Sequence, residues 1–390
     1  MSGEKTTAKP FKAKLKKVCN PVFYGAVTAA TLLAPYGGAV AQTSDSIENV
    51  VVVGIRGGLT RAVDIKRNSD SVVDAISAED IGKFPDNNVA ESLARVPGVS
   101  VSRQFGEGSK VSIRGASDQL TLTTLNGQNV ASTGWYSQQA IDRSFNYSML
   151  PPEVIAGIEV YKSSQADLVE GGVGGTVNVR TRKPLDLDSG TGFVSAKAAD
   201  SSTSDETDVS LSGLYSFKNE SETLGALVSV AQSDYSLVRF GTEALPSWGG
   251  RIGPVNFNQE RNRTAVDVVA QYSPNEAWDV TVHYLDLELE ADGTNHAAFI
   301  PQDTSNCQTN AQGVPILCST AADFDPIARD TFYEARTRLA TMTSETIDLS
   351  VDYHGDGFQA SFQAGATEAS GGTDFESQIA YISGVGGATG

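Results

Sequence analysis

The residues that could do chemistry in this chain of 390 residues are suited to recognition rather than to catalysis. Its three histidines, His283, His296 and His354, show no metal-ligand spacing to its cysteines. The glycine run 171–175 lacks the following Gly-Lys-Ser/Thr of a phosphate loop, and no hydrolase triad is visible. The sequence therefore predicts no enzyme activity, no catalytic residue, no metal site and no cofactor.

Recognition residues are densest in the segment 132–147. Trp135 and Tyr136 offer flat aromatic faces there. The hydrogen-bonding and charged groups of the segment are those of Gln138, Gln139, Asp142, Arg143 and Asn146, and Trp248 is a further aromatic candidate. Such a mixture suits a polyhydroxylated sugar, which presents C–H faces to rings and hydroxyls to amides and acids. A ferric siderophore or other chelate also fits aromatic rings and Arg143. The alternative without a ligand is a segment that only packs two parts of the protein together.

A second recognition element is a β-prone stretch near the N-terminus, residues 47–53. It consists of Ile47, Glu48, Asn49, Val50, Val51, Val52 and Val53. Four consecutive valines are poor helix formers but suit a strand that adds to the sheet edge of another protein. The alternative is an ordinary first strand of the domain that follows.

The N-terminus has the three-part layout of a secretory signal peptide. A lysine-rich leader precedes the apolar run 22–34, and Ala39-Val40-Ala41 supplies small residues for cleavage. The apolar run is too short to span a bilayer as a helix. We predict that residues 1–41 are removed and that Gln42 becomes the mature N-terminus. The net charge of −18 argues against nucleic acid as a partner.

The cysteines agree with export. Cys19 belongs to the leader, so Cys307 and Cys318 remain in the mature chain. Because an exported protein meets an oxidising compartment, we predict a local disulfide between them that pins a surface loop. Two unrelated free thiols are the alternative.

Residues 57–185 read as one mixed α/β domain. A helix is predicted at 87–96, where an Asn cap precedes apolar residues at helical spacing and Pro97-Gly98 ends the pattern. Short strands are predicted at 70–77, 99–103, 110–114, 121–125, 155–161 and 176–182, with glycines between several of them.

The chain after residue 190 alternates apolar and polar residues with the period of β-strands. The predicted strands are 192–199, 207–217, 223–233, 264–272, 278–290, 346–353 and 358–366, with a possible eighth at 376–383. The segment 278–290 breaks phase after Tyr284, which suggests a bulge or an exit from a membrane. Tight connections at 218–222, 273–277 and 354–357 alternate with long ones at 234–263 and 291–345.

That rhythm favours a transmembrane barrel with short turns at one end and long loops at the other. Aromatic residues flank the tight turns, as a girdle at a membrane interface would: Tyr215, Phe217, Tyr272, Trp278, Tyr353 and Phe358. A soluble β-sandwich is the alternative, because its strands alternate as well. The predicted fold is a mixed α/β plug domain followed by antiparallel transmembrane β-barrel strands, with the barrel incomplete in this chain.

Five stretches of the first domain together resemble the plug of TonB-dependent outer-membrane receptors. They are Ser71 to Gly98, Val111-Ser-Ile-Arg-Gly115, Leu125-Asn-Gly127, Ile158-Glu-Val-Tyr-Lys-Ser163 and Glu170 to Pro184. The chain is most similar to the subgroup common in Caulobacter- and Xanthomonas-type bacteria, which is often associated with carbohydrate uptake. The resemblance implies that residues 47–53 are the TonB box, on a periplasmic tail at 42–56. It also implies a barrel of some 22 strands, of which 190–390 would hold about seven, so we expect a fragment or a truncated gene product.

The resemblance implies active import across the outer membrane of a Gram-negative cell. The expected partners are a TonB-type energy transducer in the periplasm, outer-membrane lipid and a small-molecule or oligosaccharide ligand. A carbohydrate is the first expectation for that ligand, and a ferric siderophore or other metal chelate is the alternative. A non-functional truncated remnant and a passive outer-membrane protein are the alternatives of another class.

Overall fold

The computed structural model describes residues 67, 72–77, 86–135, 142–166, 168–245, 251–300, 307–309, 315–318 and 331–382. All of them belong to one compact unit, Val52–Gly390. The predicted signal peptide and TonB box lie outside the described residues. The same holds for Tyr136, Gln138, Gln139 and Trp248.

The plug contains a five-stranded sheet with the order β1-β6-β7-β4-β5. The strands are β1 Val73–Ser77, β4 Thr121–Leu125, β5 Gln128–Asn129, β6 Ile155–Tyr161 and β7 Gly175–Thr181. The pair β4 and β7 is parallel, and the other pairs are antiparallel. All of these strands except the two-residue β5 match segments that the sequence predicts.

A hairpin and a short helix pack beside this sheet. The hairpin consists of β2 Val99–Gln104 and β3 Glu107–Ile113, and the helix α4 is Val89–Leu93. Asn88 caps the helix by accepting from the Glu91 backbone N–H at 3.3 Å, and its Nδ2 donates to the Gly108 carbonyl at 2.8 Å. Short 3₁₀ turns η1 to η4 lie at Asp118–Leu120, Tyr147–Met149, Pro152–Val154 and Pro184–Asp186.

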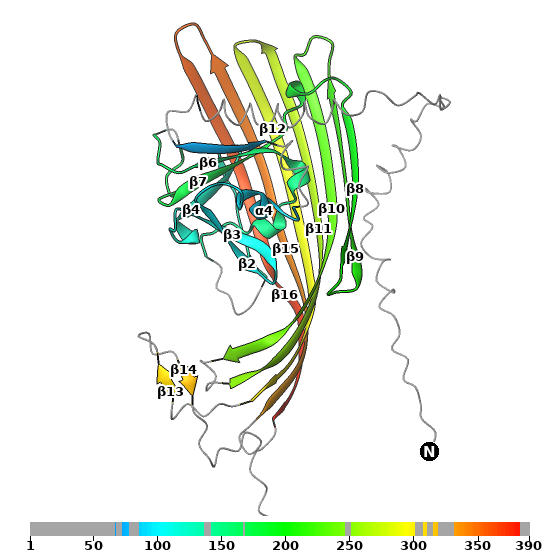
Figure 1. The fold of residues 1–390 in the computed structure, drawn as a ribbon. Helices are drawn as coiled ribbons and strands as arrows, with labels where there is room; N and C mark the ends of the chain where they lie inside the picture. Colours follow the sequence, from blue (N-terminus) through cyan, green and yellow to red (C-terminus); the bar gives the residue numbers. More distant parts are fainter. Residues whose placement is uncertain are drawn as a thin grey trace, which may run out of the picture. The chain divides into compact units, whose positions relative to one another are not determined.

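The second part is an antiparallel sheet of seven long strands, called the wall below, in which neighbours in the chain are neighbours in the sheet (Figure 1). The strands are β8 Gly192–Ser201, β9 Glu206–Lys218, β10 Leu224–Leu245, β11 Arg251–Asn275, β12 Trp278–Phe299, β15 Phe332–His354 and β16 Gln359–Ile382. Within the described residues the sheet is open, with β8 and β16 at its edges. The predicted plug followed by antiparallel barrel strands is confirmed.

Strands β8 and β9 are close to their predicted lengths, but the other five wall strands are much longer than predicted, and one predicted loop is wrong. The expected long loop 234–263 is mostly strand, because β10 runs to Leu245 and β11 begins at Arg251. Likewise the predicted eighth strand, 376–383, overlaps the second half of β16. The tight turns at one end of the wall are present as predicted.

The predicted bulge after Tyr284 is also wrong, and the reason is a change in which face of the strand is apolar. The register of β12 with β11 runs unbroken from Val280 to Ala297. Up to Tyr284 the outward side chains are apolar, including Val280 and Val282. Beyond Tyr284 the apolar side chains point inward, where Leu285, Leu287 and Leu289 are buried in a core shared with the plug. Outward positions there carry acids instead.

The outward face near the tight turns keeps exposed apolar side chains, as a lipid-facing band does. Examples are Val228, Val282 and Ile347, which are 48%, 43% and 50% exposed. Aromatic rings cluster at the turns: the Trp278 and Tyr353 ring centroids lie 4.7 Å apart, and those of Tyr353 and Phe358 lie 5.1 Å apart. No helix in the described ranges is long and apolar enough to cross a bilayer.

Candidate functional site at the contact between plug and wall

The hairpin β2–β3 turns at two residues with left-handed backbone, Phe105 (φ 52°) and Gly106 (φ 84°). Two-residue hairpin loops favour this conformation because its twist matches that of the strands. Gly106 is also close to the wall, since a Cβ atom there would lie 3.2 Å from side-chain atoms of Leu237 and Tyr235 on β10. The tip of the hairpin therefore packs directly against strand β10 of the wall.

The first residue of β3, Glu107, is buried against two arginines of β11. Its Oε1 accepts from Arg263 Nη2 at 2.7 Å, and its Oε2 accepts from Arg261 Nη1. The Glu107 and Arg263 side chains are each 1% exposed. Burial alone would raise the pKa of Glu107, but Arg263 and Arg261 outweigh it and hold that pKa below its ordinary value.

Arg263 ties several plug segments to the wall at once. Its Nε donates to the Ser148 carbonyl at 2.5 Å, and its Nη1 donates to the Asn87 carbonyl at 3.3 Å. Nη1 also donates to Ser233 Oγ of the neighbouring strand β10 at 3.2 Å. The planar, multiply donating guanidinium suits this role, because it can satisfy acceptors on several segments in fixed directions.

An aromatic cluster with two guanidinium groups lies at the hairpin tip. The rings of Phe105 and Phe257 stack with centroids 4.6 Å apart, and Trp135 lies 5.4 Å from Phe105. The Arg239 guanidinium carbon is 5.9 Å from the Phe105 centroid and 5.7 Å from that of Phe257. Arg261 is likewise 5.9 Å from the Trp135 ring. Cations over aromatic faces are attracted by the ring quadrupole. Both guanidinium groups also have carboxylate partners, Glu243 for Arg239 and Glu107 for Arg261, and Arg239 is the exposed one of the two.

Of the predicted ligand residues that are described, most are engaged inside the plug. Trp135 is 4% exposed. Asn146 accepts from the Ser148 backbone N–H at 3.2 Å and donates to the Thr133 carbonyl at 3.2 Å. Asp142 pairs with Lys110 at 2.6 Å.

The environment of Asp142 also affects its ionisation. Partial burial raises the pKa of Asp142, but hydrogen bonds from Lys110 and Ser144 outweigh burial and lower it. Arg143 is exposed. The proposed ligand role of these residues therefore stays a prediction, and among those described Arg143 is the most accessible.

A second buried polar cluster lies on the inner face of the wall toward the tight turns. His283 of β12 sits between Asp267 of β11, with 2.7 Å from Nε2 to Oδ1, and Asp348 of β15, with 2.9 Å from Nδ1 to Oδ2. The plug turn Asn126–Gly127 approaches the same ring, and Asn126 Nδ2 lies 3.5 Å from His283 Nδ1. All three wall side chains are at most 3% exposed.

Neither cluster is predicted from the sequence. Arg261 and Arg263 fall in the predicted loop 234–263, and the spacing of His283 was weighed only for a metal site. The partners of Glu107 lie 154 and 156 residues away in the chain, so no local spacing reveals them. The available signal was the period-two pattern of β11, which places Arg261, Arg263 and Asp267 on one face.

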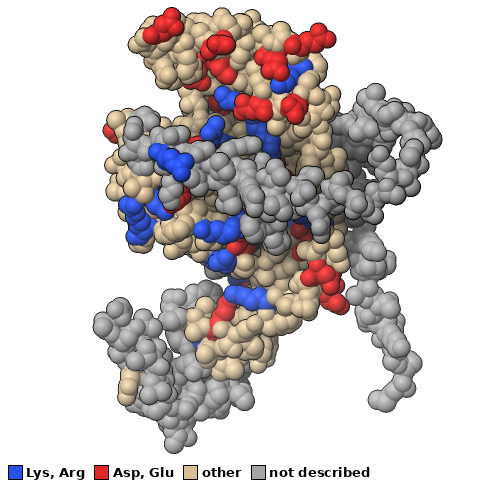
Figure 2. Space-filling model, turned by 45° about the horizontal axis from the view of Figure 1, so that its top comes forward, with Lys and Arg blue, Asp and Glu red and all other residues tan. Residues whose placement is uncertain are grey.

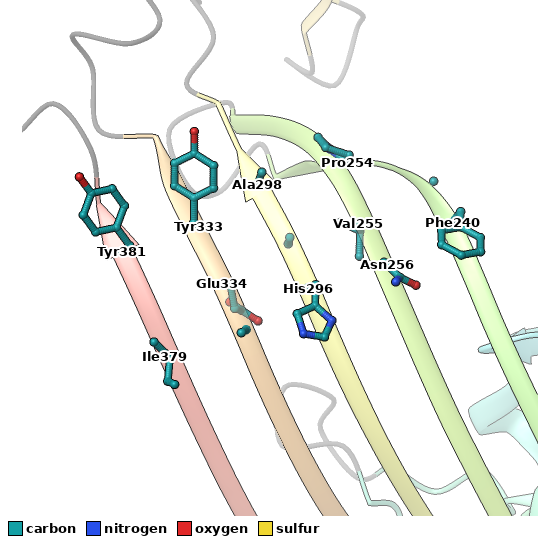
Figure 3. Close-up of a pocket in the computed structure, with 13 residues that line it drawn as sticks. Phe240, Pro254, Val255, Asn256, His296, Ala298, Tyr333, Glu334, Ile379 and Tyr381 are labelled. Atoms are coloured by element: carbon teal, nitrogen blue, oxygen red, sulfur yellow. The ribbon is translucent and has the colours of Figure 1, made fainter. Parts of the chain in front are cut away.

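The opposite, outward face of the wall carries a separate groove of about 550 Å³. Figure 3 shows Phe240, Tyr333, Ile379 and Tyr381 around it, on strands β10, β15 and β16. These side chains are 46% to 74% exposed. Because alternate residues of a strand point to opposite faces, the groove is not part of the interior surface that meets the plug.

Charge is distributed unevenly between the turns and the plug. Figure 2 shows carboxylates at the end of the wall that carries the tight turns, where Glu220, Glu222, Glu276 and Asp356 are exposed, and basic groups around the plug. In the part of the chain that the structure describes, no group of three or more His, Cys, Asp or Glu side chains could hold a metal ion. The predicted disulfide stays a prediction, although Cys307 and Cys318 are directly opposite each other in the pair β13 (Cys307–Thr309) and β14 (Pro315–Cys318).

Comparison with known proteins agrees with this architecture. A family model described as TonB-dependent Receptor Plug Domain matches residues 65–176. The ferric enterobactin receptor PirA of Pseudomonas aeruginosa is 28% identical over 261 residues, which are 62% of this chain and 33% of that protein. The ferrienterobactin receptor of Escherichia coli K12 is 33% identical over 123 residues, 28% of this chain and 16% of that protein.

Among solved structures, the siderophore receptor PirA from Acinetobacter baumannii aligns with a TM-score of 0.37 at 14% identity, covering 82% of this chain and 57% of that one. The chain thus spans about a third or less of the two curated relatives described above.

A plug domain fastened to the inner face of antiparallel, lipid-facing strands defines a plugged outer-membrane barrel protein. The plug-domain match and these relatives confirm the predicted resemblance to TonB-dependent outer-membrane receptors, and they support the predicted location in the Gram-negative outer membrane. The predicted subgroup remains a prediction.

Proposed function

We propose that the protein takes part in TonB-dependent import of a ferric siderophore across the outer membrane, with no chemistry on the ligand. The ligand binds at the end of the plug that carries the β2–β3 hairpin, and binding favours a state in which residues 47–53 reach a TonB-type partner in the periplasm. The partner then pulls on the plug, and the solute passes between plug and wall.

The observation that carries the choice of ligand is the aromatic cluster with Arg239 at the hairpin tip. A siderophore complex that is aromatic and anionic would be recognised by stacked rings and a guanidinium group together. The two relatives described above are named as receptors for ferric enterobactin, which supports the same class. The predicted carbohydrate has weaker support, because Asp142 and Asn146 already use their polar atoms inside the plug.

Growth and binding of a deletion strain carrying the gene test this proposal. We expect the wild type to restore growth on limiting iron supplied as a ferric catecholate, and not growth on limiting oligosaccharides. Deletion of residues 47–53 should abolish uptake while leaving binding to isolated outer membranes intact. Uptake that survives the deletion would instead indicate a passive protein, and oligosaccharide-dependent growth would restore the carbohydrate.

One substitution tests the ligand-facing cluster directly. We expect Arg239→Gln to weaken binding of the ferric catecholate by roughly tenfold, since one charge-assisted contact is lost. Arg180→Gln is the matched control, because both arginines are exposed and ion-paired: Arg239 pairs with Glu243 of its own strand, and Arg180 pairs with Glu159 of the plug at 2.9 Å. Equal binding by the two variants would remove Arg239 from the site.

A further inference from the structure

The cluster around His283 imposes a condition on the protonation of its ring. Both ring nitrogens face a carboxylate oxygen within hydrogen-bond distance, Asp267 at 2.7 Å and Asp348 at 2.9 Å. A neutral imidazole has only one N–H and can donate to one of them, whereas the imidazolium donates to both. The geometry therefore fits the charged ring, in which Nδ1–H donates a hydrogen bond to Asp348 and Nε2–H donates one to Asp267.

The Nδ1 atom has a second neighbour, and that neighbour comes from the plug. Asn126 Nδ2 lies 3.5 Å from it, at the limit of a hydrogen bond. Two donors cannot bond to each other, so the charged ring makes no bond to Asn126. When Nδ1 loses its proton, its lone pair can accept from Asn126 while Nε2–H stays with Asp267. The ring thus exchanges a wall partner, Asp348, for a plug partner.

We propose that His283 is a proton-dependent positioning residue for the plug turn Asn126–Gly127. The turn is otherwise held by contacts that do not titrate. Asn126 Oδ1 accepts from the Thr181 backbone N–H at 3.0 Å, and Gln363 Nε2 of β16 donates to the Asn126 carbonyl at 2.8 Å. Only the His283 contact changes with the proton.

The charges around the ring come from each packed element. The wall contributes Asp267 from β11 and Asp348 from β15, and the plug contributes Arg182, which acts electrostatically on Asp267 and donates to the Glu153 carbonyl at 2.6 Å. The next pair along β12 is Asp279 with Lys183 at 3.6 Å.

When the His283 ring is charged, the two cations, His283 and Arg182, balance the two carboxylates, Asp267 and Asp348. Loss of the ring proton leaves an excess negative charge in a buried site, and Asp267 Oδ2 already has no hydrogen-bond partner among the described residues. Protonation of His283 therefore changes both the charge balance inside the wall and the contact between His283 and Asn126 of the plug.

Hydrogen exchange in isolated outer membranes tests the proposal without ligand or TonB partner, so it is independent of the proposed function. The backbone amides of Asn126 and Gly127 are bonded within the plug, to the Val179 carbonyl at 2.8 Å and to Asn178 Oδ1 at 2.9 Å, so their exchange reports opening of the turn. After correction for intrinsic rates, we expect protection of a peptide covering 121–130 to rise as the ring deprotonates. The expected rise is roughly twofold to tenfold, the range for one hydrogen bond. NMR of ¹⁵N-labelled histidine locates that pH.

Two variants separate positioning from a merely structural role. His283→Gln should give a flat pH profile, because the amide does not titrate. Asp348→Leu should raise protection of the turn already at lower pH, since the ring no longer needs its second proton and Nδ1 is free for Asn126. A structural role predicts that both variants loosen the turn at every pH, and that result would overturn the proposal.

Two further variants guard against misfolding and against other histidines. Asn126→Gly keeps a residue suited to the left-handed turn (φ 51°) but removes the donor, so the pH step in exchange should vanish while the ring still titrates. His296→Gln is the matched control, because His296 is exposed on the outward face. A pH step that persists in Asn126→Gly, or that disappears in His296→Gln, would refute the assignment.

Discussion

Two buried ionic clusters join the plug to the wall, and they differ in what carries the positive charge. Around Glu107 the charge sits on Arg261 and Arg263, which stay protonated at any pH a cell meets. Around the two aspartates of the second cluster it sits on His283, whose charge depends on one proton. The first cluster is therefore a permanent tie, an ionic contact between plug and wall whose positive charge does not change with pH, whereas the charge of the second cluster changes when His283 loses its proton.

The number of ties differs as well. The arginine cluster holds the hairpin by its carboxylate and by the carbonyls of Ser148 and Asn87. The histidine cluster reaches the plug through one long polar contact, from His283 to Asn126, and through the charge of Arg182 acting on Asp267. We therefore expect the turn at 126–127 to open more readily than the hairpin tip when the plug is pulled.

The largest effect should come from breaking the permanent tie. Glu107→Gln leaves two buried guanidinium groups without their carboxylate, which we expect to destabilise the plug by about 3–5 kcal/mol. Urea titration followed by protease sensitivity of the hairpin measures the loss. Arg103→Gln is the control, because its pair with Glu91 is 50% and 22% exposed and such surface pairs contribute about 0–1 kcal/mol. Equal losses in both variants would contradict the role given to burial.

Acid should weaken the same tie. Because the folded-state pKa of Glu107 lies below its ordinary value of 4.5, its contribution to stability is complete above that pH and is lost as the pH falls through the folded pKa. We expect hairpin protection from exchange to hold from neutral pH down to about 4.5 and to decline below it. Glu107→Gln should remove this acid step. A decline that begins near pH 6 would point to a different group.

The sequence predicted the strand centres of the wall and the strand ends at the tight turns, but not the far ends of β10, β11, β12, β15 and β16. Near the tight turns, lipid outside and polar groups inside give a clean alternation, as at 346–353. Further along, plug contacts make the inner face apolar, so that Leu285 to Leu289 invert the pattern and appear as a break. The two-residue period of the sequence cannot show this change of face, because it shows which residues share a face of the strand but not which face is buried.

The candidate site was less predictable than the fold. Aromatic and amide residues at 132–147 stand out by composition, yet Trp135 is buried and Asn146 caps a 3₁₀ turn. Glu107 resembles an ordinary exposed acid in a Gly-flanked hairpin. Its role depends on residues more than 150 positions away that only the folded wall brings to it. Long-range ion pairs leave no local signature in a single sequence.

A smaller effect should follow from a substitution at Arg263 that keeps the positive charge but removes the planar guanidinium group. Arg263→Lys retains a cation for Glu107, but a lysine cannot reach the Ser148 and Asn87 carbonyls and Ser233 together. We expect a loss of about 1–3 kcal/mol, the range for buried acceptors left without a donor. The urea titration used for Glu107→Gln measures it. A loss as large as that of Glu107→Gln would show that geometry, rather than charge, holds the hairpin.

The smallest effect sharpens the difference between the two clusters. Gln363→Ala removes the donor to the Asn126 carbonyl, a contact that is exposed and does not titrate. We expect the turn to lose about 0.5–1 kcal/mol of protection against exchange, the net value of one ordinary hydrogen bond. The loss should be the same at every pH, because neither partner ionises. A loss that varied with pH would mean that Gln363 acts through His283, and the two contacts to the turn could then no longer be treated as independent.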